Sequence, residues 1–277
     1  MPSREQLHKY QERMINFIYT TPKCALWAGL GLGKTITTLT AIVDLIDSMV
    51  VSKVLIVAPL RVANSVWHKE AANWQHTKHL RFSIVTGSEK ERLAALHKTA
   101  DVYVINRENV TWIVEHYAKK WPFDMIVLDE ASSFKSSSSQ RFKSLRKTIP
   151  FTNRLVELTG TPSPNGLLDI WSQMYLLDCG ERLGRSMTAY KQRFFEAGYN
   201  GYSFKPVKSA DRIIHKLIDD IVISLNVDDY LEMPDRIDTV IRVSLPPSRM
   251  VEYKQLEREF LIQINDNNIV AYNAATL

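Results

Sequence analysis

Cysteine and long hydrophobic runs are both scarce in this sequence. Cys24 and Cys179 are the only cysteines among 277 residues, which argues against a disulfide framework or a cysteine-rich metal site and favours a reducing location. Apolar runs such as VLIVAPL are far shorter than the roughly 20 residues that span a bilayer. The first residues, MPSREQLHKYQERM, lack the apolar core of a signal peptide. We therefore expect a soluble cytoplasmic protein with no membrane partner.

Neither sign of charge dominates the chain. Lysine and arginine number 35 against 30 aspartate and glutamate, which gives a net charge of +5. This weak basic bias is compatible with nucleic acid but does not indicate it alone. Hydrophobic residues make up 45% of the chain, which is enough for the core of one large or two modest domains.

Strand-like and helix-like segments alternate over roughly the first 178 residues. The segments that read as strands are largely apolar, and they are CALWAG, KVLIVAPL, RFSIVTG, DVYVIN, FDMIVLDE and RLVELTG. Such strands with helices between them predict an α/β fold, a mostly parallel sheet with helices on both faces. After Cys179 the chain becomes aromatic and basic, and we expect helices with loops there, followed by a strand in RIDTVIRVSL.

Three of the ten glycines crowd into residues 29–33, within the stretch AGLGLGKT. Glycines such as Gly31 and Gly33 let backbone N–H groups turn toward phosphate oxygens, and the positive end of the following helix favours the same anion. Lys34 would reach the β- and γ-phosphates, and the Thr35 hydroxyl would bind Mg²⁺. Ala28 departs from the strict phosphate-loop pattern. A glycine turn that binds nothing is the alternative, which the flanking strand and helix disfavour.

Asp129 and Glu130 end the apolar segment MIVLDE. Parallel sheets bind their ligands at the carboxyl ends of their strands. Asp129 would hold Mg²⁺ there, and Glu130 would orient and polarise an attacking water. Considered without the glycine loop, the pair could equally be an exposed acidic turn.

Two weaker motifs accompany the glycine loop and the acidic pair. In LTGTPSPN, Thr159 and Thr161 offer hydroxyls beside a glycine, although an ordinary turn has the same composition. Upstream of the glycine loop, the amide of Gln11 could pair with an adenine edge, although most such glutamines are simply on the surface.

These four motifs, in this order, resemble those of the superfamily-two helicase-like ATPases, and most closely the Swi/Snf-type DNA translocases. YQERMINFI is similar to their adenine-reading motif, AGLGLGKT to motif I, where alanine is usual, and DEAS to motif II. VAPLRVANSVWHKEAANW and VYVINREN stand in the places of motifs Ia and Ib. LTGTPSPNGLLDIWSQMYLLD resembles the long form of motif III and is the most specific match.

The resemblance covers nearly the whole chain and implies its organisation. Residues 1–178 would form a RecA-like lobe, residues 179–238 a helical extension packed on it, and residues 239–277 the incomplete start of a segment leading to a second lobe. ATP and Mg²⁺ would be the cofactors and duplex DNA the partner. The compact lobe suggests a bacterial or phage source, and hence a bacterial or infected-host cytoplasm.

The resemblance also assigns residue roles. Gln11 would bind adenine, and Gly31, Gly33, Lys34 and Thr35 the phosphates. Thr35 and Asp129 would hold the metal, with Lys34, Asp129 and Glu130 as the catalytic residues. Thr159 and Thr161 would couple hydrolysis to movement.

Two features depart from the family pattern. Ser132 stands where motif II commonly has histidine. No motifs of a second lobe follow, although that lobe supplies the arginine fingers that stabilise transition-state charge. We therefore expect a second RecA-like lobe in cis or in trans, and weak or no turnover by this lobe alone.

A basic run follows motif II. Residues 131–156 contain no acid and six basic residues, namely Lys135, Arg141, Lys143, Arg146, Lys147 and Arg154. Contact with DNA phosphates is one interpretation, and a solvated helix face is the blander one. By resemblance, Arg61 and Arg107 are better placed for DNA, together with Lys135.

The leading hypothesis is therefore the ATP-binding lobe of a DNA-dependent ATPase. A DNA- or nucleotide-binding regulatory fragment without turnover is the alternative. An unrelated phosphate-loop ATPase or kinase is a third option, which the motif III stretch disfavours.

Overall fold

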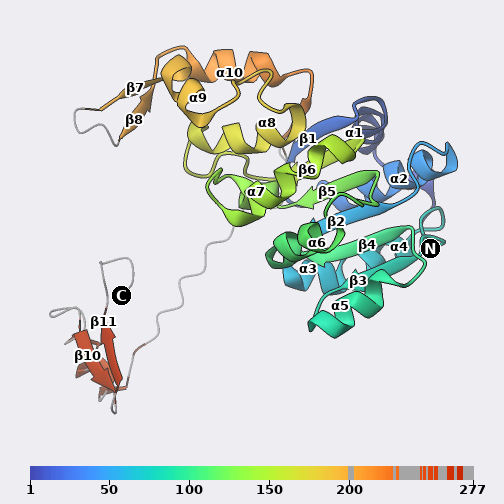
Figure 1. Cartoon of the computed structure of the whole chain (residues 1–277), viewed down its shortest axis with the longest axis horizontal. Coiled ribbons are helices and arrows are strands. Elements are labelled where there is room, and N and C mark those ends of the chain that lie inside the picture. The colour runs from blue at the N-terminus through green and yellow to red at the C-terminus, as the bar shows by residue number, and fades with distance from the viewer. Residues whose placement is uncertain are drawn as a thin grey trace. The chain divides into compact units, whose positions relative to one another are not determined.

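The computed structural model describes residues 1–198, 203–226, 229–230, 244, 246–247, 249–251, 253–254, 261–264 and 267–270. The chain divides into two units, Met1–Glu232 and Met233–Leu277. In the second unit, β10 (Leu261–Ile264) pairs antiparallel with β11 (Asn267–Val270). The first unit contains the large sheet and its helices (Figure 1). It also carries every residue singled out above as a candidate site.

A seven-stranded sheet with the order β3-β4-β2-β5-β6-β1-β9 forms the first unit, and all its strand pairs are parallel. This confirms the predicted α/β class. Apolar, β-branched stretches form the strands because both of their faces are covered. The strands are β1 (Lys23–Ala28), β2 (Val54–Ala58), β3 (Phe82–Val85), β4 (Val102–Asn106), β5 (Met125–Asp129), β6 (Arg154–Thr159) and β9 (Val222–Leu225).

Helices cover both faces of this sheet. One core cluster joins the strands to helices α1 (Lys9–Thr20), α2 (Lys34–Asp47), α3 (Leu60–Ser65) and α4 (Trp67–Asn73). The other cluster joins them to α5 (Glu89–Leu96), α6 (Val110–Tyr117), α7 (Gln140–Arg146), α8 (Ile170–Asp178), α9 (Met187–Phe194) and α10 (Ala210–Ile218). The predicted placement of helices on both faces is therefore confirmed.

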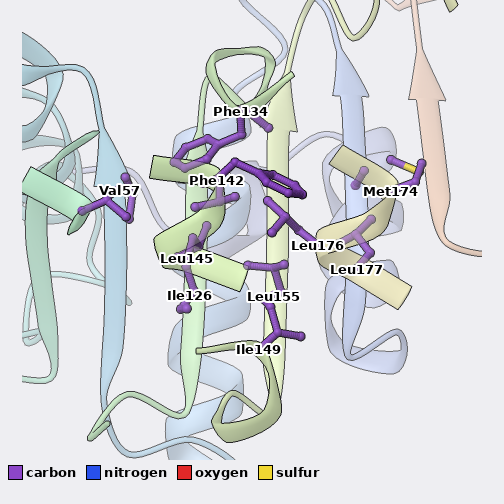
Figure 2. Packing of buried hydrophobic residues seen from close by; sticks show 14 of the residues in the cluster. Val57, Ile126, Phe134, Phe142, Leu145, Ile149, Leu155, Met174, Leu176 and Leu177 are labelled. Carbon is purple, nitrogen blue, oxygen red and sulfur yellow. The ribbon is translucent and has the colours of Figure 1, made fainter. Parts of the chain in front are cut away.

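Figure 2 shows part of the second cluster, where α7 and α8 pack on β5 and β6. Phe142 and Leu145 of α7 lie beside Ile126 and Leu155 of the sheet, and these side chains have at most 1% of their surface exposed. Burying one such side chain stabilises the fold by roughly 1.5–3 kcal/mol. This packing fixes the carboxyl end of β5, where the acidic pair lies.

The region expected to extend the lobe contributes directly to the sheet. Its β9 pairs with β1, with Ala25 opposite Val222. Residues 179–216 contain α9 and the start of α10, as expected, but also an unexpected antiparallel pair, β7 (Phe195–Ala197) and β8 (Phe204–Pro206). The division at residues 178 and 238 stays a prediction, and the strand expected in RIDTVIRVSL lies almost wholly outside the described residues. Within the described part of the chain, no helix combines the length and the apolarity that a membrane crossing requires.

Candidate nucleotide-binding site

The glycine loop joins β1 to α2 in a left-handed backbone conformation. Gly31 has φ 85° and Gly33, the N-cap of α2, has φ 73°. A side chain at Gly33 would be strained by this backbone conformation, and its Cβ would overlap the Nε2 atom of Gln11, which would have to move. The loop therefore presents backbone N–H groups and the start of α2, the arrangement that favours a bound phosphate.

Lys34 folds back onto this loop. Its Nζ donates to the carbonyl oxygens of Ala28 at 2.6 Å and Gly29 at 3.0 Å. Burial lowers the pKa of Lys34, and the charges of Glu130 and Asp129 oppose that shift. A phosphate would offer the ammonium a charged acceptor in place of these neutral carbonyls, and such charge-assisted bonds are stronger.

Asp129 and Glu130 occupy the carboxyl end of β5, two strands from β1 in the sheet. Burial raises the pKa of Asp129, a hydrogen bond from Trp67 lowers it, and the charge of Glu130 raises it further. Glu130 has φ 57° and ψ 59°, the left-handed region, which costs a non-glycine residue roughly 1–2 kcal/mol. Local strain of this kind is concentrated at functional sites.

One open pocket of about 380 Å³ brings the two motifs together. Of the predicted residues, it contains Gly31, Gly33, Lys34, Thr35, Asp129 and Glu130. Larger hollows of about 500 and 550 Å³ lie elsewhere on this unit, but neither is lined by Lys34 or the acidic pair. We assign the site to the smaller pocket because the chemistry lies there.

The donor set of this pocket fits magnesium held together with phosphate. Among the described residues, no group of three or more histidine, cysteine, aspartate or glutamate side chains could hold a metal. Magnesium commonly takes only one or two carboxylates and completes its shell with water and substrate phosphates. Thr35 and Asp129, which line the same pocket, supply a hydroxyl and a carboxylate of that kind.

Gln11 lies behind the loop rather than in the pocket. Its side chain is 6% exposed, accepts from the His8 backbone N–H at 2.8 Å and donates to the Leu32 carbonyl at 3.4 Å. The amide therefore links the start of α1 to the glycine loop. Its role in binding adenine stays a prediction.

The motif III stretch lies against the same loop. Thr159, fully buried at the end of β6, accepts from the backbone N–H of Thr161 at 3.1 Å. A Cβ on Gly160 would lie 3.5 Å from the carbonyl oxygen of Ala28. The backbone at Gly160 therefore lies close to the end of β1, where the glycine loop begins, and the coupling role of both threonines stays a prediction.

The predicted DNA-contacting residues follow the carboxyl ends of three strands. Arg61 is exposed near the start of α3, after β2. Arg107, after β4, pairs with Glu108 at 3.0 Å, and Lys135, after β5, lies 3.6 Å from Asp169. All three therefore share the sheet edge that carries the glycine loop, and their contact with DNA stays a prediction.

Arg154 behaves differently from the rest of the basic run. It is 7% exposed and donates to the carbonyls of Ile18 and Tyr19, each at 2.6 Å. A buried guanidinium cannot reach a DNA phosphate, so that interpretation is wrong for this residue.

Sequence reasoning missed two residues beside the acidic pair. Trp67 donates through Nε1 to Oδ2 of Asp129 at 3.0 Å, and Glu70 lines the pocket together with Val62 and Val66. The spacing of Val62, Val66 and Glu70, four residues apart, could have indicated one helical face. The contact of Trp67 with a residue 62 positions away carried no local signal.

Comparison with known proteins identifies the family. The family model described as the SNF2-related domain matches residues 10–276. The chain belongs to the SNF2-related domain family. This confirms the resemblance that the motifs indicated.

The relatives within this family include phage and animal proteins. Protein p41 of Acyrthosiphon pisum secondary endosymbiont phage 1 is 38% identical over 277 residues, which is 96% of this chain and 60% of p41. The DNA excision repair protein ERCC-6-like of Mus musculus is 30% identical over 197 residues, covering 66% of this chain and 16% of that protein. The chain thus spans less than two thirds of the length of each of these relatives.

A solved SNF2 structure has the same fold. The Sulfolobus solfataricus SWI2/SNF2 ATPase core in complex with dsDNA superposes with a TM-score of 0.66 at 22% identity. The match covers 91% of this chain and 52% of the archaeal chain. The RecA-like SNF2 fold expected from the motifs is therefore confirmed.

Proposed function

We propose that this SNF2-family chain is the ATP-binding lobe of a DNA-dependent ATPase that moves along double-stranded DNA. The observation that carries the proposal is the single pocket in which the glycine loop and Thr35 face Asp129 and Glu130. Phosphate-binding, metal-binding and water-orienting groups are what nucleotide hydrolysis requires. The archaeal relative solved with dsDNA supports duplex DNA as the track.

Each residue then has a chemical task. The loop N–H groups and Lys34 bind the phosphates, while Thr35 and Asp129 hold Mg²⁺. The metal supplies charge neutralisation at the phosphate oxygens. Glu130 orients the attacking water and accepts its proton. Gln11 selects adenine, and Arg61, Arg107 and Lys135 contact the DNA backbone.

Turnover is expected to be slow without a second lobe. Arginine fingers contribute several powers of ten in rate in related phosphoryl-transfer enzymes. The relatives are longer than this chain, and we propose that a second RecA-like lobe, in cis or in trans, supplies these arginines.

Phosphate release from Mg-ATP, with and without duplex DNA, tests this function. Turnover that DNA stimulates, and that Glu130→Gln abolishes while nucleotide still binds, is the expected result. Glu115→Gln, an exposed change on α6, is the matched control and should leave the rate unchanged. DNA stimulation that persists in Glu130→Gln would contradict the assignment.

A DNA- or nucleotide-binding fragment without turnover is the alternative function. The observation that favours this alternative is that the match covers only 52% of the archaeal ATPase core. Background phosphate release in every sample, with duplex and nucleotide binding retained, would support this alternative. A second RecA-like lobe, produced separately and added to this chain, would then separate the two hypotheses. The leading proposal expects this addition to restore ATP turnover, and the alternative expects no turnover.

A further inference from the structure

Trp67 is the first residue of helix α4 and Trp74 is the residue just after its end, and each donates its indole N–H to a carboxylate. Trp67 Nε1 donates to Asp129 Oδ2 at 3.0 Å, and Trp74 Nε1 donates to Glu70 Oε1, also at 3.0 Å. The two bonds have the same chemistry and length. They differ in where the acceptor lies, because Glu70 belongs to α4 itself whereas Asp129 lies at the end of β5.

Trp67 is held rigidly. Its side chain has no exposed surface, and it packs in the core cluster between the sheet and helices α1 to α4. A close-packed indole cannot rotate away without opening a cavity. Its N–H therefore has one fixed direction, toward Asp129.

Asp129 needs such a donor. The carboxylate is half-buried and lines the pocket that contains Lys34 and Thr35. A hydrogen bond to one oxygen restrains rotation about the Cβ–Cγ bond. Partners of metal ligands act in this way, and losing one typically weakens metal binding by roughly 10- to 100-fold.

We propose that Trp67 is a positioning residue of the magnesium site, which fixes the Asp129 carboxylate in the orientation that receives the metal. This rests on the proposed function, since it takes Asp129 as the metal-binding carboxylate. It adds a residue in the motif Ia stretch that acts through motif II rather than on nucleotide or DNA.

The test compares Trp67→Phe with Trp112→Phe in the full chain. Trp112 Nε1 also donates to a carboxylate, Glu89 Oε1 at 3.3 Å, and neither of these residues lines the pocket. Both changes keep an aromatic ring and remove one indole N–H donor, so Trp112→Phe is the matched control. The measurement is the affinity of a fluorescent ATP analogue, first in EDTA and then over a Mg²⁺ titration.

Trp67→Phe should raise the half-saturating Mg²⁺ concentration by about tenfold or more, with the affinity in EDTA unchanged. Trp112→Phe should move that concentration less than about twofold. An unmoved Mg²⁺ dependence in Trp67→Phe would overturn the proposal, and so would an equal shift in both variants. In an Asp129→Asn background, Trp67→Phe should add no further shift, because coupled residues are not additive.

The wild-type chain offers a second measurement that does not depend on a variant folding. The indole N–H resonance of Trp67 should shift when Mg²⁺ and nucleotide are added, while that of Trp112 stays in place. An unmoved Trp67 resonance at saturation would count against the proposal. Nucleotide affinity that is unaffected by Lys34→Ala would instead refute the phosphate-loop assignment, which separates the two failures.

Discussion

Glu157 lies in the middle of β6 with no exposed surface. Its register neighbours are Ala25 of β1 and Leu128 of β5. Within the described part of the chain, neither carboxyl oxygen has a hydrogen-bond partner. An ionised carboxylate would be strongly disfavoured there, and complete burial raises the pKa of Glu157 well above its ordinary value.

Glu157→Gln should therefore stabilise the protein at neutral pH. The folded-state pKa is raised, so below the unfolded pKa both states are protonated and Glu157 has little effect. As the pH rises, only the unfolded state ionises, and the wild type loses up to about 1.4 kcal/mol per pH unit until the folded pKa is reached. Chemical denaturation at pH 4 and pH 8 measures this. A stability gain that does not grow with pH would contradict the expected ionisation.

At the scale of elements, a single arginine joins the first helix to the sheet. Arg154, the first residue of β6, donates through Nη2 to the carbonyls of Ile18 and Tyr19 in the last turn of α1. A helix leaves its last carbonyls without intrahelical donors, and a cation there also interacts favourably with the helix dipole. Arg154 therefore fixes the carboxyl end of the helix whose other end places Gln11 against the glycine loop.

Arg154→Met should lower the free energy of unfolding by about 2–4 kcal/mol, since two charge-assisted hydrogen bonds are lost and buried carbonyls remain unpaired. Urea denaturation measures the change. Lys143→Met, an exposed change of the same charge in α7, should stay within about 0.5 kcal/mol of the wild type. Equal effects of the two substitutions would show that the contacts with α1 contribute little.

At the scale of the whole molecule, the sheet is complete only when β9 is present. Without it, β1 would be an edge strand with unpaired N–H and C=O groups, and exposed edges promote aggregation. The core cluster that joins the sheet to helices α5 to α10 would also lose Ile214 and Ile218 of α10. The compact unit therefore needs residues beyond the boundary at 178 that the alternation of strands and helices suggested.

A fragment of residues 1–178 should aggregate, whereas residues 1–232 should be monomeric and unfold cooperatively. Size-exclusion chromatography and thermal unfolding of the two fragments measure this. A monomeric 1–178 fragment with a single sharp transition would show that β9 and α10 are dispensable.

Much of this fold could be predicted because its strands are continuous apolar runs and its glycine loop has a strict spacing. The acidic pair was predictable because parallel strands bring their carboxyl ends to one edge. The buried state of Glu157 was not, because Glu157 and Thr159 alternate with the apolar residues Val156 and Leu158 as in a half-exposed strand. β9 is only four residues long, and the Trp67 contact depends on tertiary packing.

The pairing of β1 with β6 and β9 also determines when the sheet can form during protein synthesis. β1 leaves the ribosome before both of its partners, which begin at Arg154 and Val222. Synthesis adds roughly 5–20 residues per second, so β9 is complete about 10 to 40 s after β1. Nucleotide can stabilise only a loop that is already formed. ATP therefore cannot stabilise β1 and the glycine loop before β6 and β9 have been synthesised. Until then, β1 is protected from aggregation by chaperones or by its own burial beneath α1 and α2.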